Sequence, residues 1–237
     1  MNKSSMKYWY PKIKKLNIPQ PKTIILDFGA NRLWEFVPDV KIEKRIEEEE
    51  NKKVIFKIKE NAKKLGYPFF MRTDHCSAKH SYNKTCYVSK EEDILRNLVH
   101  LIEENELMSF MSFNFEAVIL REFIKLEHYF TAFQGLPIAK ERRYFVRDGK
   151  IEEHFPYWIE DAISSFHNPS EKKWKELLKK INKETDEEVA LLSKYAEMVG
   201  KEIEGYWSVD FAKGIDDKWY LIDMAEGEKS FNPRLHK

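Results

Sequence analysis

The sequence contains little of several features that identify protein classes directly. Only 2 of its 237 residues are cysteine, so we expect neither a disulfide framework nor a CxxC metal site, and Cys76 and Cys86 are interpreted as ordinary thiols of a reducing compartment. No apolar run approaches the roughly 20 residues that cross a bilayer. The start, MNKSSMKYWY, lacks the hydrophobic core of a signal peptide. We therefore expect a soluble, cytoplasmic protein that does not enter a membrane.

Excess charge of one sign is also missing. The 41 Lys and Arg residues nearly balance the 40 Asp and Glu residues, so no overall field attracts nucleic acid, and a nucleic-acid partner is not expected. By contrast, the chain is 42% hydrophobic and 14% aromatic. This is enough apolar material to form the core of one large domain or of two smaller lobes.

Apolar periodicity predicts a mixture of strands and helices. Helices are expected to end at Gly66 and to cover 89–105, where Ser89 and Glu92 suggest a capping box, and 170–204. Strands are expected in 23–25, at Pro68 to Arg72, near Tyr87, and in 115–124, 128–135, 142–148, 150–158, 206–212 and 218–225. The Asp148–Gly149 pair predicts a tight turn between two of these strands.

Two aspartates lie inside apolar strand patterns. Asp210 stands in YWSVDFA and Asp223 in KWYLIDMA, and GIDD joins the two strands. A buried carboxylate needs a hydrogen-bond donor, a basic side chain or a cation. Taken singly, each aspartate is equally well explained by hydrogen bonds to the backbone. As a pair on neighbouring strands, they form the oxygen set that magnesium prefers beside phosphates.

Basic side chains supply the opposite charge. Arg72 ends an expected strand, Lys79 lies in the following loop, and Arg143 belongs to a later strand. Guanidinium and ammonium groups both neutralise phosphate oxygens, and Ser77 adds a hydroxyl donor. Each residue alone is typical of a protein surface. Combined with the two aspartates, they favour a polyphosphate site.

The order of these segments resembles the ATP-grasp superfamily of ATP-dependent ligases over residues 18–232. IPQPKT is similar to the lead into that family's small lobe, and YPFFMR to a strand ending in a basic residue. DHCSAKHSY is similar to its phosphate-covering loop, and WSVDFAKGIDDKWYLIDMAEGE to its paired metal-binding strands. The resemblance implies ATP and Mg²⁺, with Arg72, Ser77 and Lys79 on the phosphates and Asp210 and Asp223 on the metal.

The hinge and the basic strand also have counterparts in that family. ILREFIKLE resembles the hinge, which implies that Glu122 and Ile124 offer backbone groups to adenine, Phe123 lies between them, and Glu127 accepts from the ribose. ERRYFVRDGKI resembles the basic strand. This implies that Arg143 acts catalytically on the transferred group, and Arg143 or Lys79 then steadies an oxyanion.

Three positions depart from the family pattern. The second metal strand usually carries glutamate and, two residues later, asparagine, whereas this chain has Asp223 and Ala225. We predict that Glu226 substitutes as a metal ligand, with Glu228 as the alternative. Arg121 stands where the hinge often begins with an acid.

The resemblance implies an α+β fold of two lobes, each a largely antiparallel sheet with helices, and ATP between them. The expected organisation is an N-terminal extension at 1–17, a small lobe and hinge at 18–124, and a large lobe with the metal-binding strands at 125–237. A full substrate lobe before this core is missing from the sequence, so recognition of the substrate falls to the core itself or to another subunit.

The implied activity is ATP- and Mg²⁺-dependent ligation. A small-molecule or peptide carboxylate is activated as an acyl phosphate and attacked by an amine or a similar nucleophile. The main alternative is an ATP-binding assembly factor or chaperone that does not ligate and that has a protein partner. Polynucleotide ligation is a weaker alternative, because VRDGK places its lysine on the wrong side of the aspartate and glycine.

Overall fold

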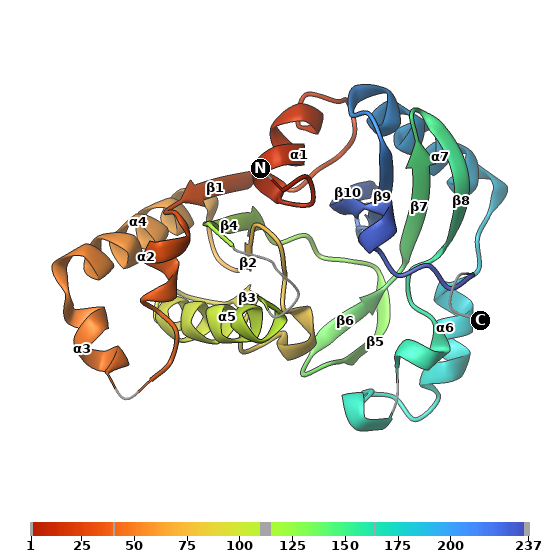
Figure 1. Ribbon diagram of the computed structural model, residues 1–237. Coiled ribbons are helices and arrows are strands. Elements are labelled where there is room, and N and C mark those ends of the chain that lie inside the picture. Colours follow the sequence, from red (N-terminus) through yellow and green to blue (C-terminus); the bar gives the residue numbers. More distant parts are fainter. Residues whose placement is uncertain (1, 40, 110–114, 164, 235–237) are drawn as a thin grey trace. The chain divides into compact units, whose positions relative to one another are not determined.

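The computed structural model describes residues 2–39, 41–109, 115–163 and 165–234 (Figure 1). Strands and helices form two compact units. The large unit comprises Met1–Gln20, Lys125–Ala132 and Pro137–Lys237, and the small unit comprises Pro21–Ile124 and Phe133–Leu136. The predicted α+β class is confirmed. The first 20 residues group with the large unit, whereas the sequence suggested a separate extension.

A four-stranded antiparallel sheet forms the centre of the small unit. Its strand order is β1-β4-β2-β3. The strands are β1 (Thr23–Asp27), β4 (Ala117–Glu122), β2 (Phe69–Thr73) and β3 (Tyr87–Val88). Because side chains alternate along each strand, Met71 and Leu120 face the helices while Arg72 and Arg121 face the opposite side.

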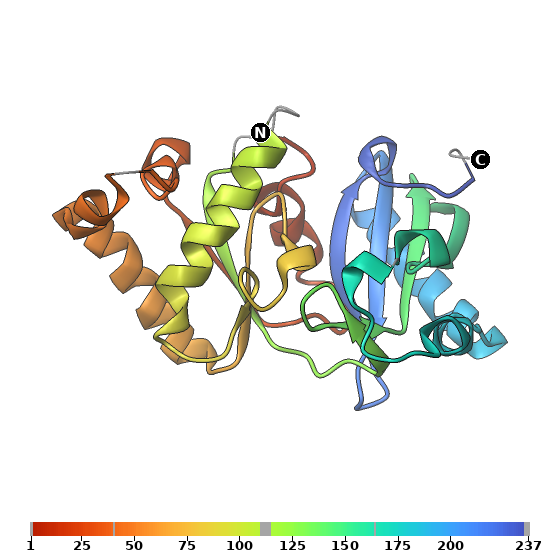
Figure 2. The same cartoon turned by 90° about the horizontal axis from the view of Figure 1, so that it is seen from below.

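Helices cover one face of this sheet. They are α2 (Ala30–Trp34), α3 (Ile42–Glu47), α4 (Glu49–Leu65) and α5 (Asp93–Ser109), and Figure 2 shows α4 and α5 on the same side of the strands. Ile58 of α4 and Leu98 of α5 are fully buried against Phe69 and Met71 in one apolar cluster. This burial fixes which sheet face remains available to polar groups.

The sheet of the large unit also has four antiparallel strands, in the order β10-β9-β7-β8. The strands are β7 (Glu141–Arg147), β8 (Lys150–Pro156), β9 (Tyr206–Lys213) and β10 (Trp219–Glu226). A separate two-stranded sheet pairs β5 (His128–Ala132) with β6 (Leu136–Ala139). The sequence predicted β5 but not β6, whose LPIA run is too short to show an alternating pattern.

The helices of the large unit are α1 (Met6–Ile13), α6 (Trp174–Ile181) and α7 (Asp186–Glu202). Thr185 caps α7 by accepting from the backbone N–H of Glu188. The α7 helix contacts β7, β8 and β9, and Leu192, Ala196 and Val199 are fully buried there. Tyr144 and Val209 point to this helical face, so Arg143 and Asp210, one position away on their strands, point to the other.

Each outer pairing of this sheet contains a β-bulge. In β10 the register shifts between Leu221 and Asp223, so that Asp223 rather than Ile222 lies opposite Asp210. In β8 the shift near Phe145 makes Glu153, rather than Glu152, its partner. An extra residue reverses the alternation of the strand beyond it. The two bulges therefore decide which acidic side chains reach the face away from α7.

Several local predictions are confirmed. The long helix α4 ends at Leu65, and Gly66 follows with φ of 93°, a conformation that favours glycine. Asp148 and Gly149, with φ of 47° and 79°, form the turn between β7 and β8. The capping prediction at Ser89 is wrong in detail, because α5 begins at Asp93 and the Ser89 hydroxyl donates to the Asp93 carboxylate at 2.6 Å.

None of the helices in the described ranges combines the length and the apolar character that a bilayer-crossing segment requires.

Candidate functional site

Three charged side chains form a row across the large sheet. Arg143 in β7 is the direct register partner of Asp210 in β9, which is in turn the partner of Asp223 in β10. Directly opposed residues of an antiparallel pair point to the same face with Cβ atoms about 5 Å apart. The structure thus brings together the two aspartates and one of the three basic residues predicted from the sequence.

Arg143 and Asp210 form a bidentate ion pair. Nε and Nη2 of Arg143 each donate to one oxygen of Asp210, both at 2.7 Å. Only 14% of the Arg143 side chain and 7% of the Asp210 side chain are exposed. Burial disfavours the charged guanidinium, but attraction by Asp210 and, more weakly, by Asp223 outweighs it, so the pKa of Arg143 is raised above its ordinary value.

An aromatic ring and a backbone carbonyl complete the surroundings of Arg143. The guanidinium carbon lies 4.7 Å from the ring centroid of Tyr157, a cation–π distance. The third nitrogen, Nη1, donates to the carbonyl oxygen of Phe231 at 3.2 Å. The guanidinium is consequently held on three sides, and its orientation is set by the fold.

The carboxylates provide a test of whether magnesium fits this row. Asp210 and Asp223 fit by chemistry and number, because Mg²⁺ is commonly bound by one or two carboxylates together with phosphate oxygens and water. In the part of the chain that the structure describes, no group of three or more acidic, histidine or cysteine side chains is arranged for a metal ion. Both oxygens of Asp210 accept hydrogen bonds from Arg143. A cation at Asp210 would therefore compete with that guanidinium.

Glu226, the predicted substitute ligand, is not brought to this row. It pairs with Trp207 in register, one step out of phase with Asp223, and therefore belongs to the helical face. Its carboxylate accepts from the Ser4 hydroxyl at 3.0 Å and forms an ion pair with Lys229. Burial opposes the charge, but these two partners outweigh it and lower the pKa of Glu226. Its role as a metal ligand stays a prediction.

Ala225 occupies the position where the family pattern expects an amide oxygen. It lies on the same face as Asp223 and is the register partner of Ser208. The Ser208 hydroxyl is within 3.4 Å of the Ala225 carbonyl oxygen and within 2.5 Å of the Ser230 hydroxyl. Two hydroxyl groups therefore lie where the family pattern has an asparagine side chain.

The small sheet presents two arginines on the face away from its helices. Arg72 in β2 and Arg121 in β4 are 4% and 5% exposed. Arg72 donates through Nε to the carbonyl of Thr73 at 3.1 Å and through Nη2 to the carbonyl of His75 at 3.5 Å. Arg121 donates to the Thr23 hydroxyl at 3.3 Å. Arg121 replaces the expected acid of the hinge and makes this face more basic.

The loop after Arg72 is tied down by its own hydrogen bonds. The Thr85 hydroxyl lies 2.7 Å from the Ala78 carbonyl and 3.0 Å from that of Ser81. Ala78 adopts a left-handed conformation with φ of 48° just before a 3₁₀ turn at Lys79–Ser81. Ser77 and Lys79 are partly exposed on this loop. The expected lid is thus a compact turn, and its two predicted phosphate ligands lie on its outer part.

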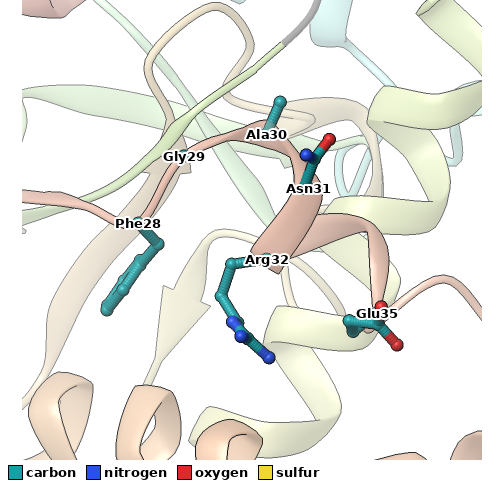
Figure 3. Close-up of a pocket in the computed structure, with 6 residues that line it drawn as sticks. All are labelled: Phe28, Gly29, Ala30, Asn31, Arg32 and Glu35. Atoms are coloured by element: carbon teal, nitrogen blue, oxygen red, sulfur yellow. The ribbon is translucent and has the colours of Figure 1, made fainter.

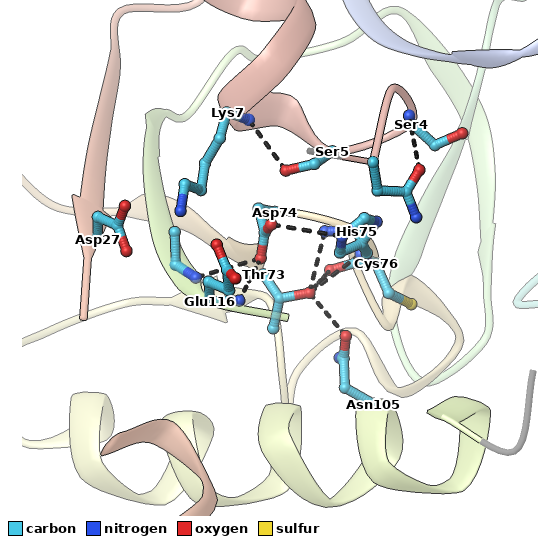
Figure 4. A network of polar contacts seen from close by, with 12 residues as sticks. Ser4, Ser5, Lys7, Asp27, Thr73, Asp74, His75, Cys76, Asn105 and Glu116 are labelled. Carbon is cyan, nitrogen blue, oxygen red and sulfur yellow. Dashed lines mark hydrogen bonds and ion pairs between the residues drawn. The ribbon is translucent and has the colours of Figure 1, made fainter. Parts of the chain in front are cut away.

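A polar network anchors the base of the same loop (Figure 4). Asp74, 1% exposed, accepts from the backbone N–H groups of Glu116 and Ala117 at 3.0 and 3.2 Å. The Thr73 hydroxyl lies 2.6 Å from the Asn105 side-chain oxygen and accepts from the N–H of Cys76 at 3.0 Å. The residues that follow Arg72 are therefore fastened to β4 and α5.

The predicted hinge residues lie at the end of β4 and just beyond it. Glu122 accepts from the N–H of Lys22 at 3.1 Å through its side chain. Phe123 meets Tyr87 edge to face, with centroids 5.3 Å apart. Ile124 ends this part of the small unit. Glu127 belongs to the large unit, where its backbone binds Lys213 and Lys140 and its carboxylate lies 3.9 Å from Lys213 Nζ.

Two polar residues near Arg143 were missed by the sequence. Glu153 in β8, 14% exposed at its side chain, accepts from the Asn232 amide and pairs with Arg234 at 3.2 Å. Asn232 is itself 2% exposed. Alternation counted from the Asp148–Gly149 turn selects Glu152 instead, because the sequence gives no sign of the bulge. The NPR segment at 232–234 carried the only signal, a proline-flanked asparagine close to the metal strands.

A pocket of about 500 Å³ lies elsewhere in the small unit (Figure 3). It is lined by consecutive residues around the start of α2: Phe28, Gly29, Ala30, Asn31, Arg32 and Glu35. None of the predicted site residues lines it. We therefore place the candidate site at the charged sheet faces and not at this pocket.

Comparison with known proteins gives the class to which this fold and charged row belong. A family model described as an ATP-grasp domain, the third family of its clade, matches residues 59–236. The protein is thus an ATP-grasp protein, with the ATP-binding, ligase-type fold of that superfamily. Within the superfamily it belongs to the third clade family that this model describes. No curated protein matches the chain.

Solved structures agree with this assignment at the level of fold. Cdc123 from Schizosaccharomyces pombe is similar with a TM-score of 0.61 and 17% identity, covering 98% of this chain and 85% of that one. A C-terminally truncated form of the same protein gives 0.62 and 15%, with coverage of 98% and 84%. N5-carboxyaminoimidazole synthase from Aspergillus clavatus, in complex with ADP and an aminoimidazole ribonucleotide, gives 0.50 and 12%, with coverage of 94% and 44%.

Proposed function

We propose that the protein is an ATP- and Mg²⁺-dependent ligase that activates a carboxylate as an acyl phosphate for attack by an amine or a similar nucleophile. The observation that carries the proposal is the row of Arg143, Asp210 and Asp223 on adjacent strands. Cationic and anionic groups at this spacing suit phosphoryl transfer, where catalysis consists mainly of positioning and charge neutralisation. Membership of the ATP-grasp family supports the nucleotide.

The reaction proceeds in two balanced steps. A carboxylate oxygen of the substrate attacks the γ-phosphorus of ATP, the bond to the bridging oxygen breaks, and ADP leaves with that electron pair. The amine nitrogen then attacks the acyl carbon, phosphate departs, and the nitrogen loses a proton to solvent. Magnesium, held by Asp210 and Asp223, supplies charge neutralisation on the phosphate oxygens.

The residues of the chain take separate roles in this proposal. Arg143 neutralises the transferred phosphoryl group and, in the second step, it or Lys79 steadies the oxyanion. Arg72, Ser77 and Lys79 bind the phosphates. Glu122, Phe123, Ile124 and Glu127 contact the adenosine, and Glu226 remains the candidate for a third metal ligand.

The direct test is ADP release with a panel of acceptors. Purified protein is incubated with ATP, Mg²⁺, small carboxylates, amino acids and cellular peptides, and ADP is measured by a coupled assay. The proposal expects ADP to appear only when a carboxylate and a nucleophile are both present. Asp223→Asn removes a charge at nearly constant volume and is expected to abolish that signal, while the exposed Asp216→Asn serves as the matched control.

A second candidate is an ATP-binding assembly factor that does not ligate. The Arg143–Asp210 pair and Ala225 favour it, because one carboxylate is neutralised and one expected ligand oxygen is missing. This function predicts tight ATP binding, measurable by calorimetry, with ADP release that no acceptor stimulates. Acceptor-dependent release of ADP would reject it.

A further inference from the structure

The segment 227–234, called the strap below, follows β10 and turns back over the face of the large sheet that carries Arg143. Its first residue, Gly227, packs so closely against Tyr206 that a Cβ atom at this position would overlap the ring carbons. The Ser230 hydroxyl lies 2.5 Å from the hydroxyl of Ser208 in β9, which is 1% exposed. The strap is thus seated on β9 by close packing and a buried polar contact.

The middle of the strap contacts Arg143 directly. The carbonyl oxygen of Phe231 accepts from Nη1 of Arg143 at 3.2 Å. The other two donor directions of the guanidinium are occupied by Asp210. Because the guanidinium is a rigid planar fork, an acceptor on the Nη1 side restricts its rotation and tilt.

Glu153 anchors the far end of the strap to β8. One carboxylate oxygen accepts from the side-chain amide of Asn232, and the other lies 3.2 Å from Nη1 of Arg234. Asn232 is 2% exposed, and its own oxygen accepts from the backbone N–H of Arg234 at 2.9 Å. One carboxylate therefore holds two strap residues, and they flank Phe231 on one side only.

We propose that Glu153 is a positioning residue, which holds the strap so that the Phe231 carbonyl fixes the Arg143 guanidinium. This inference rests on the proposed function, in which Arg143 meets the transferred phosphoryl group. Glu153 touches neither Arg143 nor the reacting atoms in this role. Its removal is expected to loosen Arg143 while leaving the rest of the sheet and the small unit as they are, because groups that support a catalytic side chain set its precision.

Three variants separate this role from a general loss of stability. Glu153→Ala removes both contacts of the strap, whereas Glu153→Gln keeps an oxygen for Asn232 and loses the pairing with Arg234. Glu152→Ala is the matched control, because this neighbouring carboxylate binds only the half-exposed Arg147 among the contacts described for it. Thermal unfolding of each variant verifies that it is folded.

Turnover provides the first readout. Glu153→Ala is expected to lower kcat by about 10–100-fold, the range typical of supporting groups, with the ATP Kd changed less than about twofold. Glu153→Gln should recover part of the loss, and Glu152→Ala should match the wild type. Equal kcat in Glu153→Ala and Glu152→Ala would overturn the proposal, as would a loss that appears in the ATP Kd alone.

A second readout does not need an identified acceptor. The Nε–H signal of Arg143 in ¹H–¹⁵N spectra is assigned by its disappearance in Arg143→Lys, and its exchange with water is measured. Exchange about tenfold faster in Glu153→Ala than in Glu152→Ala supports the positioning role, and unchanged exchange overturns it. If no acceptor yields ADP while exchange rises, the ligase proposal fails and the contact between strap and Arg143 stands.

Discussion

The two four-stranded sheets place charge in different ways. In the large unit, Arg143 meets Asp210 through strand register, and the two side chains satisfy each other. In the small unit, Arg72 donates to backbone carbonyls of its own loop, and Arg121 donates to a threonine hydroxyl. Charges that are paired with other charges depend on one another, whereas charges held by the backbone depend mainly on the fold. The first arrangement suits a site that changes during a reaction, and the second suits constant binding.

The largest expected effect tests the paired arginine. Arg143→Met should lower ATP turnover by about 10²–10³-fold while changing the ATP Kd by less than about threefold, because the missing charge acts mainly in the transition state. Turnover is measured by ADP release and affinity by fluorescent-nucleotide titration. Arg147→Met, an exposed arginine on the same strand, is the control. An equal loss in both variants would remove the distinction between the two positions.

The corresponding change in the small unit should affect a different parameter. Arg72→Met is expected to weaken ATP binding by about 10–100-fold with a smaller change in kcat, since ground state and transition state would lose the same contact. Arg96→Met, whose side chain is 54% exposed, is the control, and calorimetry gives the Kd. If Arg72→Met and Arg143→Met change the same parameter, the comparison between the sheets is wrong.

Competition between Arg143 and a cation sharpens the comparison further. Removing the guanidinium leaves the Asp210 carboxylate without its bidentate partner, so Arg143→Met should bind Mn²⁺ about 3–10-fold more tightly in the presence of a nonhydrolysable ATP analogue. The Kd is measured by electron paramagnetic resonance, which does not depend on turnover. Arg143→Met combined with Asp210→Asn should lose the gain. Unchanged Mn²⁺ affinity in Arg143→Met would show that the cation does not use Asp210.

The smallest effect concerns the helical face of the same sheet. The pKa of Glu226 is lowered by Lys229 and Ser4 against the opposing effect of burial, so its ionised form stabilises the folded state. That contribution is present above the ordinary pKa of 4.5 and is lost as the pH falls through the lower folded value. Glu226→Gln should reduce unfolding stability by about 0.5 kcal/mol at pH 7 and by less near pH 3. Denaturant melts at both pH values measure this difference.

The apolar periodicity was sufficient to predict most elements and their buried faces. Ile94, Leu98, Leu101 and Ile102 of α5 are all fully buried, as their helical spacing indicated. Gly66 ends α4 because its positive φ favours glycine. These features are local, so neighbouring residues in the sequence determine them.

The site was predictable only in part, because register is not a local property. The alternating pattern placed Asp210 and Asp223 in strands, but simple counting from the β9–β10 turn puts Ile222 opposite Asp210. The same limit led to Glu152 where the structure uses Glu153. The contact between Phe231 and Arg143 joins residues 88 positions apart. A segment without periodicity gave no reason to expect it.

The bulge in β10 has a consequence for how the chain tolerates insertions and deletions. Deleting Ile222 would keep every charged residue in the sequence yet rotate Asp223 toward α7, where its carboxylate would be buried among apolar side chains. Removing one residue from the exposed turn at Gly214–Asp217 would shift the pairing in the same way. We expect substitutions to be widely accepted in these two places and changes of length to be rejected, so natural variation here should preserve residue count more strictly than residue identity.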